Sequence, residues 1–269
     1  MSKGIVLVTG ASSGIGEACA DLLARGGWTV VGLNRRSVSG RGWTSLVVDV
    51  DSDESVLKGI SGLISEYGRI DAVVACAGWG LAGAVEQTSL LDAKAQFETN
   101  FWGCVRVVQP VLGQMRQQGR GQIVLMSSIG GIIGIPFQAF YSASKFALEG
   151  YAEALAYEVE PFNISITLVE PGNFKTGFTN DRRTSLVHAS EHDDPYYAAR
   201  TKAVNVMERD ELQGADPAAV ARSVLKILSS TNPRRRVSVG KFDERIGLMA
   251  KRLLPFKLFS KAARSSLGV

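Results

Sequence analysis

The chain has 269 residues, of which 45% are hydrophobic and 21% charged, as in a globular protein with a sizeable core. No run of about 18 apolar residues predicts a membrane-spanning helix, and no charged leader with a long apolar segment predicts a secretory signal. The three cysteines are widely spaced and match no metal or disulfide pattern, so we expect a reducing, cytoplasmic setting.

The net charge of +4 is unevenly placed. Residues 241–269 carry seven basic and two acidic side chains, a net charge of +5, so the rest of the chain is close to neutral. No helix-turn-helix, zinc finger or aromatic–basic platform accompanies this charge. We therefore expect no nucleic-acid partner.

Apolar, β-rich runs alternate with helical patterns along most of the chain. The predicted strands are residues 4–10, 28–34, 45–50, 71–78, 122–128, 164–172 and 236–239, and the predicted helices are residues 13–25, 53–67, 96–117, 141–160 and 217–229. This alternation predicts an α/β fold: a single Rossmann-type doubly wound parallel sheet of about seven strands with helices on both faces. Ligands of such sheets bind beyond the carboxyl ends of the strands.

The stretch TGASSGIG, residues 9–16, follows the first predicted strand and opens the first helix. Gly10 allows a tight turn, Gly14 lets backbone amides approach a pyrophosphate, and Gly16 lets the helix pack closely on the strand. The amino end of the helix favours phosphate. A purely structural turn is the alternative, but the strand–turn–helix context predicts a dinucleotide site.

The spacing of these glycines resembles the short-chain dehydrogenase/reductase family, and the resemblance covers about residues 4–240. It implies a nicotinamide dinucleotide as cofactor. Around the glycine turn it implies further cofactor contacts from Ser12, Ser13 and Ile15.

The second predicted strand ends in Asn34, Arg35 and Arg36. NAD-preferring enzymes usually place an acidic residue here to bond the ribose 2′-hydroxyl. Asparagine does not repel a 2′-phosphate, and an arginine can grip one with its planar fork of donors. We therefore predict NADP(H) as the cofactor, with Arg35 at the family's phosphate-binding position. Arg36 adds charge or faces solvent, and a solvated loop is the alternative for both arginines.

Two further strand ends match the cofactor pattern of the family. Asp49, with Val50 beside it, is implied to meet the adenine ring, although a strand-end or helix-capping acid is the alternative. In ACAG, residues 75–78, Ala77 and Gly78 keep the family's close approach to the cofactor. Ala75 and Cys76 replace the two asparagines that the family usually carries.

Tyr141 and Lys145, in YSASK, are four residues apart and so share one face of a predicted helix. A nearby ammonium stabilises a tyrosine phenolate, which makes the hydroxyl a usable acid or base. The resemblance implies that Tyr141 is the acid/base and that Lys145 tunes it, both also contacting the cofactor. It implies that Ser128, or alternatively Ser127, donates to a substrate carbonyl. Asn100 is implied to hold a proton-relaying water; a locally bonded amide is the alternative.

Pro171 and Gly172 follow the sixth predicted strand, and with Thr176 they are implied to flank the nicotinamide. The implied reaction interconverts a carbonyl and a secondary alcohol. A non-catalytic NADP-binding sensor on the same fold is the alternative from another class. Such proteins typically lose the tyrosine or the lysine, and both are present here.

Residues 176–214 are predicted to form a substrate lid. Phe137, Phe174 and Phe178 add apolar surface near the chemistry, which favours a lipophilic substrate; packing within the lid is the alternative. His188 and His192 have the spacing of helix-borne metal ligands, but they sit in a charged loop, so we expect no metal.

The stretches VEPGNFKT and KRLLPFKLFSK resemble the subgroup of 17β-hydroxysteroid and retinol dehydrogenases. Steroid-, retinoid- and acyl-lipid-like carbonyls all remain open as substrates. We predict one domain over 1–269, with a core (4–175), the lid, a last helix and strand (215–240) and a basic amphipathic extension (241–269).

The extension suits helices docked over the active site or on an anionic membrane, and docking on the protein is favoured. Pro255 should divide it into two helices. By family habit, we expect a homodimer or homotetramer.

Overall fold

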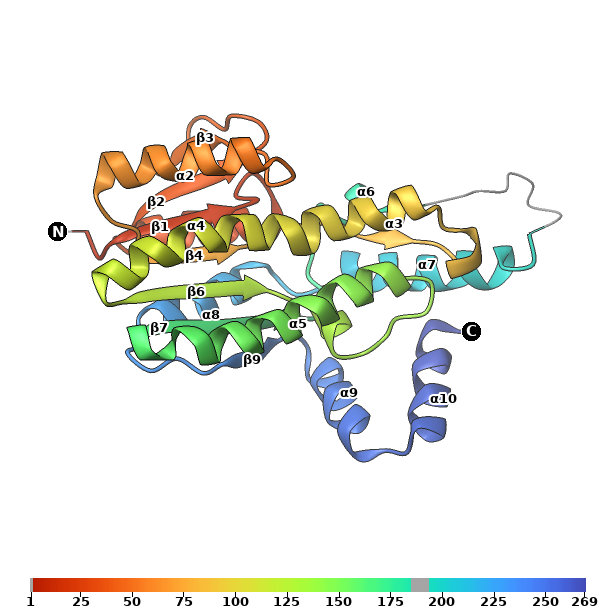
Figure 1. Cartoon of the computed structure of the whole chain (residues 1–269). Helices are drawn as coiled ribbons and strands as arrows, with labels where there is room; N and C mark the ends of the chain where they lie inside the picture. Colours follow the sequence, from red (N-terminus) through yellow and green to blue (C-terminus); the bar gives the residue numbers. More distant parts are fainter. Residues whose placement is uncertain (1, 185–193) are drawn as a thin grey trace.

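The computed structural model describes residues 2–184 and 194–269 (Figure 1). Seven parallel strands form the main sheet in the order β3-β2-β1-β4-β6-β7-β9, which confirms the predicted fold class. The strands are β1 (Ile5–Thr9), β2 (Thr29–Asn34), β3 (Thr44–Val47), β4 (Ala72–Ala75), β6 (Gly121–Met126), β7 (Ile164–Pro171) and β9 (Arg236–Val239).

Helices cover both faces of this sheet (Figure 1). On one face lie α2 (Asp53–Tyr67), α4 (Gly103–Gln118) and α5 (Ala139–Val159), and on the other lie α1 (Gly14–Arg25) and α8 (Ala218–Leu228). Successive strand residues point to opposite faces. Ile5 and Leu7 therefore pack under the first group, and Val6 and Val8 under the second. This explains why the strands are apolar throughout instead of alternating.

The strand order reverses between β1 and β4. From β1 the chain proceeds outward to β2 and β3, and from β4 it proceeds outward the other way to β6, β7 and β9. The connections on the two sides of such a switch point diverge, which opens a crevice at the carboxyl edge of the sheet. The glycine-rich turn after β1 lies at this point.

The predicted helix over residues 96–117 is wrong in its start and in its regularity. Helix α3 (Leu90–Phe97) already begins after Ser89, whose hydroxyl accepts from the Asp92 N–H as an N-cap. A π-helical turn at Glu98–Trp102 then joins α3 to α4. Such turns insert one extra residue into a helix and are frequent at functional sites.

Several elements lie outside the alternating pattern of the core. The lid segment contains α6 (Phe178–Asp181), β8 (Arg183–Thr184) and α7 (Tyr197–Leu212), and β8 pairs with β5 (Leu81–Ala82). The extension forms α9 (Phe242–Leu253) and α10 (Phe256–Leu267), which are separated at Pro255 as predicted. In the part of the chain that the structure describes, no helix combines the length and the apolarity needed to cross a bilayer.

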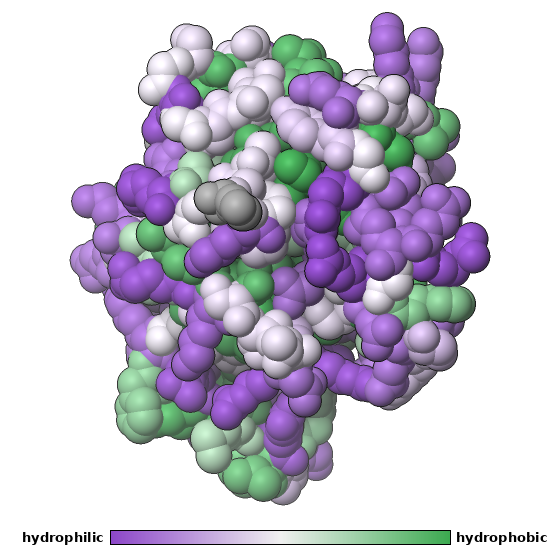
Figure 2. All heavy atoms as spheres, turned by 90° about the vertical axis from the view of Figure 1, so that its left-hand side faces the viewer, coloured by the Kyte–Doolittle hydropathy of each residue, from purple (hydrophilic) through white to green (hydrophobic). Residues whose placement is uncertain are grey.

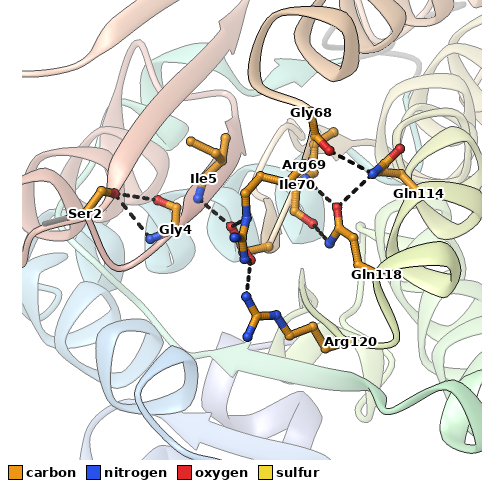
Figure 3. Close-up of polar contacts among 10 residues, drawn as sticks. Ser2, Gly4, Ile5, Gly68, Arg69, Ile70, Gln114, Gln118 and Arg120 are labelled. Carbon is orange, nitrogen blue, oxygen red and sulfur yellow. Dashed lines mark hydrogen bonds and ion pairs between the residues drawn. The ribbon is translucent and has the colours of Figure 1, made fainter.

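The amino edge of the sheet is tied together by polar contacts (Figure 3). The buried carboxylate of Asp71 accepts from the Ile5 N–H at 2.8 Å and from Arg69 Nε at 2.9 Å. The Gln118 side chain accepts from the Ile70 N–H at 3.0 Å and donates to its carbonyl at 2.9 Å. These contacts join β1, β4 and the end of α4. The loops that follow the strands lie at the opposite, carboxyl edge of the sheet.

Two glycines of α2 provide a matched test of how closely this helix packs on the sheet. A Cβ at Gly59 would come within 2.7 Å of Val48 Cγ2, whereas a Cβ at Gly62 would meet nothing within 4 Å. Alanine raises helix propensity equally at both positions. Gly62→Ala should therefore stabilise the protein by about 0.5–1 kcal/mol, whereas Gly59→Ala should destabilise it by about 1–3 kcal/mol. Urea unfolding of both variants measures the difference; equal stabilisation would contradict the packing.

Candidate active site

The glycine turn has the geometry of a phosphate cradle. Gly10 and Gly14 have positive φ angles, +66° and +58°, that residues with a Cβ rarely adopt. A side chain at Gly16 would overlap the Gly10 carbonyl, so the start of α1 fits against β1 only with glycine there. Ser13 precedes the helix without a side-chain cap, and it is exposed with its neighbour Ser12. The amino end of α1 is therefore free of a capping side chain and suits an anion.

The end of β2 provides polar groups at the position expected for the adenosine ribose. Asn34 is buried, and its Oδ1 has no partner among the described residues. Its amide nitrogen donates to the Gly32 carbonyl at 3.3 Å and to Ser45 Oγ at 3.4 Å. Arg35 and Arg36 follow with exposed side chains. An unused buried acceptor beside two exposed cations fits the ribose and phosphate of a dinucleotide.

The expected adenine contacts lie one strand further out. Asp49 is half-buried and its Oδ1 accepts from the Asp51 N–H at 3.1 Å, at the turn that leads into α2. The buried Val50 packs against Gly103, where a Cβ would come within 2.9 Å of Val50 Cγ2. Both residues therefore have local structural roles at the edge of the proposed cofactor site.

The loops after β4 and β7 approach the glycine turn from the other side. The Ala77 N–H donates to Thr9 Oγ1 at 3.0 Å, which brings the Ala77 backbone against Gly10. Thr176 lies over the turn, with its Cβ 3.3 Å from the place where a Gly14 Cβ would stand. Segments predicted separately from the sequence thus surround one crevice. Ile15, in the first turn of α1, is half-buried.

Asn100 lies in the π-helical turn and is buried. Its Oδ1 accepts from the Trp79 N–H at 3.0 Å, while its Nδ2 donates to the Trp79 carbonyl at 3.1 Å and to Ser144 Oγ at 3.2 Å. Gln96 donates to the same carbonyl at 2.7 Å. The Asn100 amide therefore fixes the backbone that follows Gly78. The sequence predicts a locally bonded amide as the alternative for Asn100. The water-holding role of Asn100 stays a prediction.

Tyr141 and Ser128 face each other across the end of β6. A Cβ at Gly130 would lie 3.0 Å from Tyr141 Cε1 and 3.4 Å from Ser128 Oγ, so the small residue leaves both hydroxyls in one space. Burial raises the pKa of Tyr141 to about 12, and a hydrogen bond with Ser128 opposes this rise. Tyr141 therefore carries its proton at neutral pH and is suited to donate it.

Lys145 lies one helical turn after Tyr141 and is also buried. Its Nζ donates to the Met126 carbonyl at 2.8 Å and stands 6.0 Å from the centroid of the Tyr141 ring. Burial lowers the pKa of Lys145 to about 8, which nearby acidic groups, Glu149 among them, partly oppose. An ammonium held in an apolar setting acts strongly on a neighbouring hydroxyl.

A buried acidic cluster stands behind Lys145. Arg236 on β9 donates to Glu149 at 2.5 Å and lies 3.7 Å from Glu170, and Ser238 Oγ donates to Glu170 at 2.6 Å. Burial raises the pKa of Glu149, and Arg236 opposes this rise. Ser127 faces this cluster: a Cβ at Gly131 would lie close to both Ser127 Oγ and Glu149 Cγ. Of the two serines, only Ser128 is on the Tyr141 side.

The beginning of the lid covers Tyr141. The Phe178 ring packs edge-on against the Tyr141 ring, with centroids 5.8 Å apart. Arg182 stands over the Phe178 ring and forms an ion pair with Glu211 of α7; the Arg182 side chain is only 1% exposed. Thr179 Oγ1 donates to the same carboxylate at 2.6 Å. A phenyl ring and a buried ion pair thus close the site above the hydroxyl.

The two other predicted substrate residues, Phe137 and Phe174, lie in different surroundings. Phe137 has a positive φ of +60°, and its carbonyl accepts from the Gly83 N–H at 2.8 Å. It borders a hollow of about 450 Å³, lined also by Gly83, Ala84, Val85, Glu86 and Tyr196. Phe174 is buried in the core cluster that lies between the sheet and α8, and its backbone bridges to Ala215. The structure therefore does not place Phe174 with the chemistry.

Pro171 and Gly172 end β7 next to the extension. Gly172 packs directly against the carboxylate of Glu244 in α9. His188 and His192 lie outside the described residues. Among the described residues, no cluster of histidine, cysteine or acidic side chains has a metal-binding arrangement.

Sequence reasoning missed several residues of this site. These residues reach the site through contacts between distant segments, such as the pairing of Arg182 with a residue 29 positions later. They are Trp79, Gln96, Arg182, Glu211 and Glu149. The one local signal is that of Glu149, which follows Lys145 by four residues and so shares its helical face.

A doubly wound sheet with a glycine turn at its switch point is a dinucleotide-binding fold. The family model for short chain dehydrogenases matches residues 4–186, and the chain belongs to this family. Members of the family bind a nicotinamide cofactor, and the cradle and crevice described above fit one.

Relatives match nearly the whole chain. A 3-ketodihydrosphingosine reductase of Bacteroides thetaiotaomicron is 40% identical over 98% of each chain, and bovine retinol dehydrogenase 8 is 36% identical over 87% of this chain and 81% of its own. A short-chain dehydrogenase from Streptomyces avermitilis has a similar structure, with a TM-score of 0.83 and 32% identity over 98% of each chain. The predicted family is confirmed, and the retinol dehydrogenase match is consistent with the predicted subgroup.

The lowered pKa of Lys145 predicts a pH dependence of stability. Between pH 8 and the ordinary value of 10.5, the unfolded chain holds the Lys145 proton while the folded chain releases it, so this residue's contribution to the free energy of unfolding rises with pH. Relative to Lys145→Met, the wild type should gain on the order of 2 kcal/mol between about pH 7.5 and pH 10. Urea unfolding at several pH values measures the gain.

An exposed lysine provides the control for this measurement. Lys94, on α3, is exposed, so Lys94→Met should leave the pH dependence of the wild type unchanged. A stability difference between wild type and Lys145→Met that does not vary with pH would contradict the assigned pKa of Lys145.

Proposed function

We propose that the protein is an NADP(H)-dependent reductase that converts the ketone of a long-chain lipid to a secondary alcohol. The observation that carries this proposal is the paired hydroxyls of Tyr141 and Ser128 beside the buried ammonium of Lys145, at the carboxyl edge of a dinucleotide-binding sheet. The bound NADPH would supply the hydride.

The residues of the chain then act on the carbonyl oxygen. Ser128 and Tyr141 donate hydrogen bonds to it and polarise the bond, and Tyr141 gives up its proton as the oxygen becomes an alcohol. Lys145 stabilises the resulting phenolate, which otherwise would be costly in this buried site. Alcohol oxidation would use the same groups in reverse.

Cofactor contacts are proposed at the surfaces already described. The glycine turn and the amino end of α1 would hold the pyrophosphate, and Asn34 with Arg35 would hold the phosphorylated ribose. The backbone at Ala77–Gly78 and the hydroxyl of Thr176 would border the nicotinamide half. Phe178 and Arg182 would exclude water above the reacting carbonyl.

The lipid assignment has two supports. Phe178 gives the cover of Tyr141 an apolar ring, which suits an apolar chain next to the carbonyl. The relative that matches 98% of both chains is named for a ketone in a sphingolipid base. We therefore extend the lipophilic-ketone prediction to long-chain acyl ketones, ahead of retinoids and steroids.

Removing the Tyr141 hydroxyl should stop the chemistry while sparing cofactor binding. In Tyr141→Phe, turnover of 3-ketodihydrosphingosine with NADPH should fall by about 10²–10⁴-fold, because the proton donor is lost. The dissociation constant for NADPH should stay within about twofold, since one hydroxyl contributes little to binding a dinucleotide. NADPH absorbance gives the rate and fluorescence titration gives the binding constant.

The two neighbouring serines provide a matched control. Ser128→Ala should lower turnover by about 10²–10³-fold, as expected for one lost donor to the reacting oxygen, whereas Ser127→Ala should retain activity. Full activity in Tyr141→Phe would refute the mechanism. Reduction of retinal or a ketosteroid in preference to the long-chain ketone would refute the substrate class alone.

Arg35 should determine the preference for NADPH over NADH. Arg35→Ala should raise the KM for NADPH by about 10–100-fold and leave the KM for NADH unchanged, because only the 2′-phosphate loses a charged donor. Arg25, exposed at the far end of α1, provides the control: Arg25→Ala should change neither constant. A wild-type preference for NADH would contradict the proposed cofactor.

A further inference from the structure

The C-terminal hairpin, defined as α9 and α10, projects from the body of the protein (Figure 1). Each helix buries one large apolar side chain, Leu248 in α9 and Phe259 in α10. Helix α10 packs against lid helix α7, and Gly268 lies against Lys202 of that helix. The sequence favours docking of the extension on the protein. The hairpin packs on the protein along one side only, and its other side is uncovered.

The base of the hairpin is fixed to the edge of the proposed active site. The carboxylate of Glu244, in the first turn of α9, accepts from the Asn173 N–H at 2.8 Å and from the Lys241 N–H at 2.7 Å. It packs against Gly172 and Gly240, where any side chain would overlap it. The hairpin therefore follows β9 and is held against the loop after β7, on the carboxyl side of the sheet.

The uncovered side of α9 is an apolar stripe. Phe242, Ile246, Met249 and Leu253 follow one another at spacings of four, three and four residues, which places them on one face of the helix. Between 49% and 78% of each side chain is exposed. Soluble surface helices point such a stripe at the core, yet here the buried residue, Leu248, is on the opposite face.

The apolar surface continues through the turn into α10. Leu254, Phe256 and Leu258 are 42%, 75% and 58% exposed. Figure 2 shows hydrophobic residues gathered at the lower end of the molecule, the end at which Figure 1 places α9 and its turn to α10. A contiguous exposed patch of this kind marks an interaction surface.

Basic side chains border this patch. Arg245 and Arg252 lie along one flank of the α9 stripe, and Lys257, Lys261 and Arg264 form a row at spacings of four and three residues along α10. All five are exposed. With two acidic residues against seven basic ones, residues 241–269 carry a net charge of +5.

We propose that the C-terminal hairpin is a docking element that lies on the surface of an anionic lipid bilayer. Exposed aromatic and aliphatic side chains flanked by lysine and arginine are the composition of interfacial helices. Twelve residues give a helix of about 18 Å, shorter than the hydrocarbon core of about 30 Å, so each helix lies on the bilayer and does not span it.

The charge also decides against a second copy of the chain as the occupant. Two hairpins packed face to face would bring net charges of +5 together, and like charges across an interface oppose association. An anionic lipid surface complements both the charge and the apolar stripe. The row of cations on α10 has no role in a purely apolar contact.

The docked hairpin would turn the carboxyl edge of the sheet toward the bilayer. Because Glu244 ties the start of α9 to the loop after β7 and α10 contacts α7, a lipid that leaves the membrane would enter beside the lid. This step rests on the proposed lipid-ketone function. Docking itself does not, because it can be measured without substrate or cofactor.

Vesicle cosedimentation of the full-length protein tests the docking. The wild type should pellet with vesicles that contain phosphatidylglycerol, and not with vesicles of phosphatidylcholine alone. Binding should fall by at least about tenfold when NaCl is raised from about 0.05 M to about 0.5 M, since salt screens the attraction. No binding to anionic vesicles at low salt would overturn the proposal.

Two matched pairs of variants test the two parts of the surface. The double variant Met249→Ser/Leu253→Ser should weaken vesicle binding by at least about tenfold, because two membrane-inserted side chains are lost. Leu90 and Leu91, which are 73% and 78% exposed at the start of α3, provide the control. Changing both to serine removes as much exposed apolar surface and should leave vesicle binding unchanged.

The basic row is tested in the same way. Changing Lys257, Lys261 and Arg264 to glutamine should weaken binding to anionic vesicles by at least about tenfold. Removing the same charge from exposed residues elsewhere, by changing Lys58, Lys94 and Arg222 to glutamine, should have less than about one third of that effect.

Alternative outcomes overturn the proposal. If light scattering shows a dimer that Met249→Ser with Leu253→Ser dissociates, and vesicles do not bind, the surface joins two copies of the chain. Equal loss of binding in test and control variants would mean general electrostatic adsorption. Reduction of a short, water-soluble ketone in the same variants reports on the proposed catalysis separately.

Discussion

The contact between Gly16 and the carbonyl of Gly10 is the constraint on which the rest of the site depends. Because no Cβ fits there, α1 starts directly against the end of β1 and aims its amino end at the carboxyl edge of the sheet. Parallel strands bring the ends of β4, β6 and β7 to that same edge. The proposed chemistry lies there, while the network around Asp71 closes the opposite edge (Figure 3).

The stability of the protein is reduced at the residue that the proposed reaction most needs. Lys145 is buried beside a backbone acceptor, and its pKa falls to about 8 because the charged form is poorly solvated there. The nearby carboxylate of Glu149 limits the cost without cancelling it. Sites shaped for reactivity commonly carry such unfavourable terms, and the well-packed core elsewhere compensates for them.

The order of strands and helices could be predicted because each core strand is an unbroken apolar run and each helix has its own periodicity. The glycine turn and the Tyr141–Lys145 pair could also be predicted, because each is a short motif within one stretch of sequence. The π-helical turn at Asn100 gave no signal, since an extra residue in a helix alters neither composition nor periodicity enough to be read. Contacts such as Arg182 with Glu211 depend on how the lid folds back, which local sequence does not encode. NADP(H) preference, residue roles and oligomeric state remain predictions.

The ion pair between Arg182 and Glu211 has a consequence for the speed of substrate exchange. Both side chains are nearly withdrawn from water, so the attraction between them is largely offset by lost hydration. If Arg182 moved away from Glu211, water would solvate both charges again and offset much of the cost of separating them. A site closed in this way would be dry while shut and would still open at small cost, which suits release of the alcohol that the proposed reaction forms.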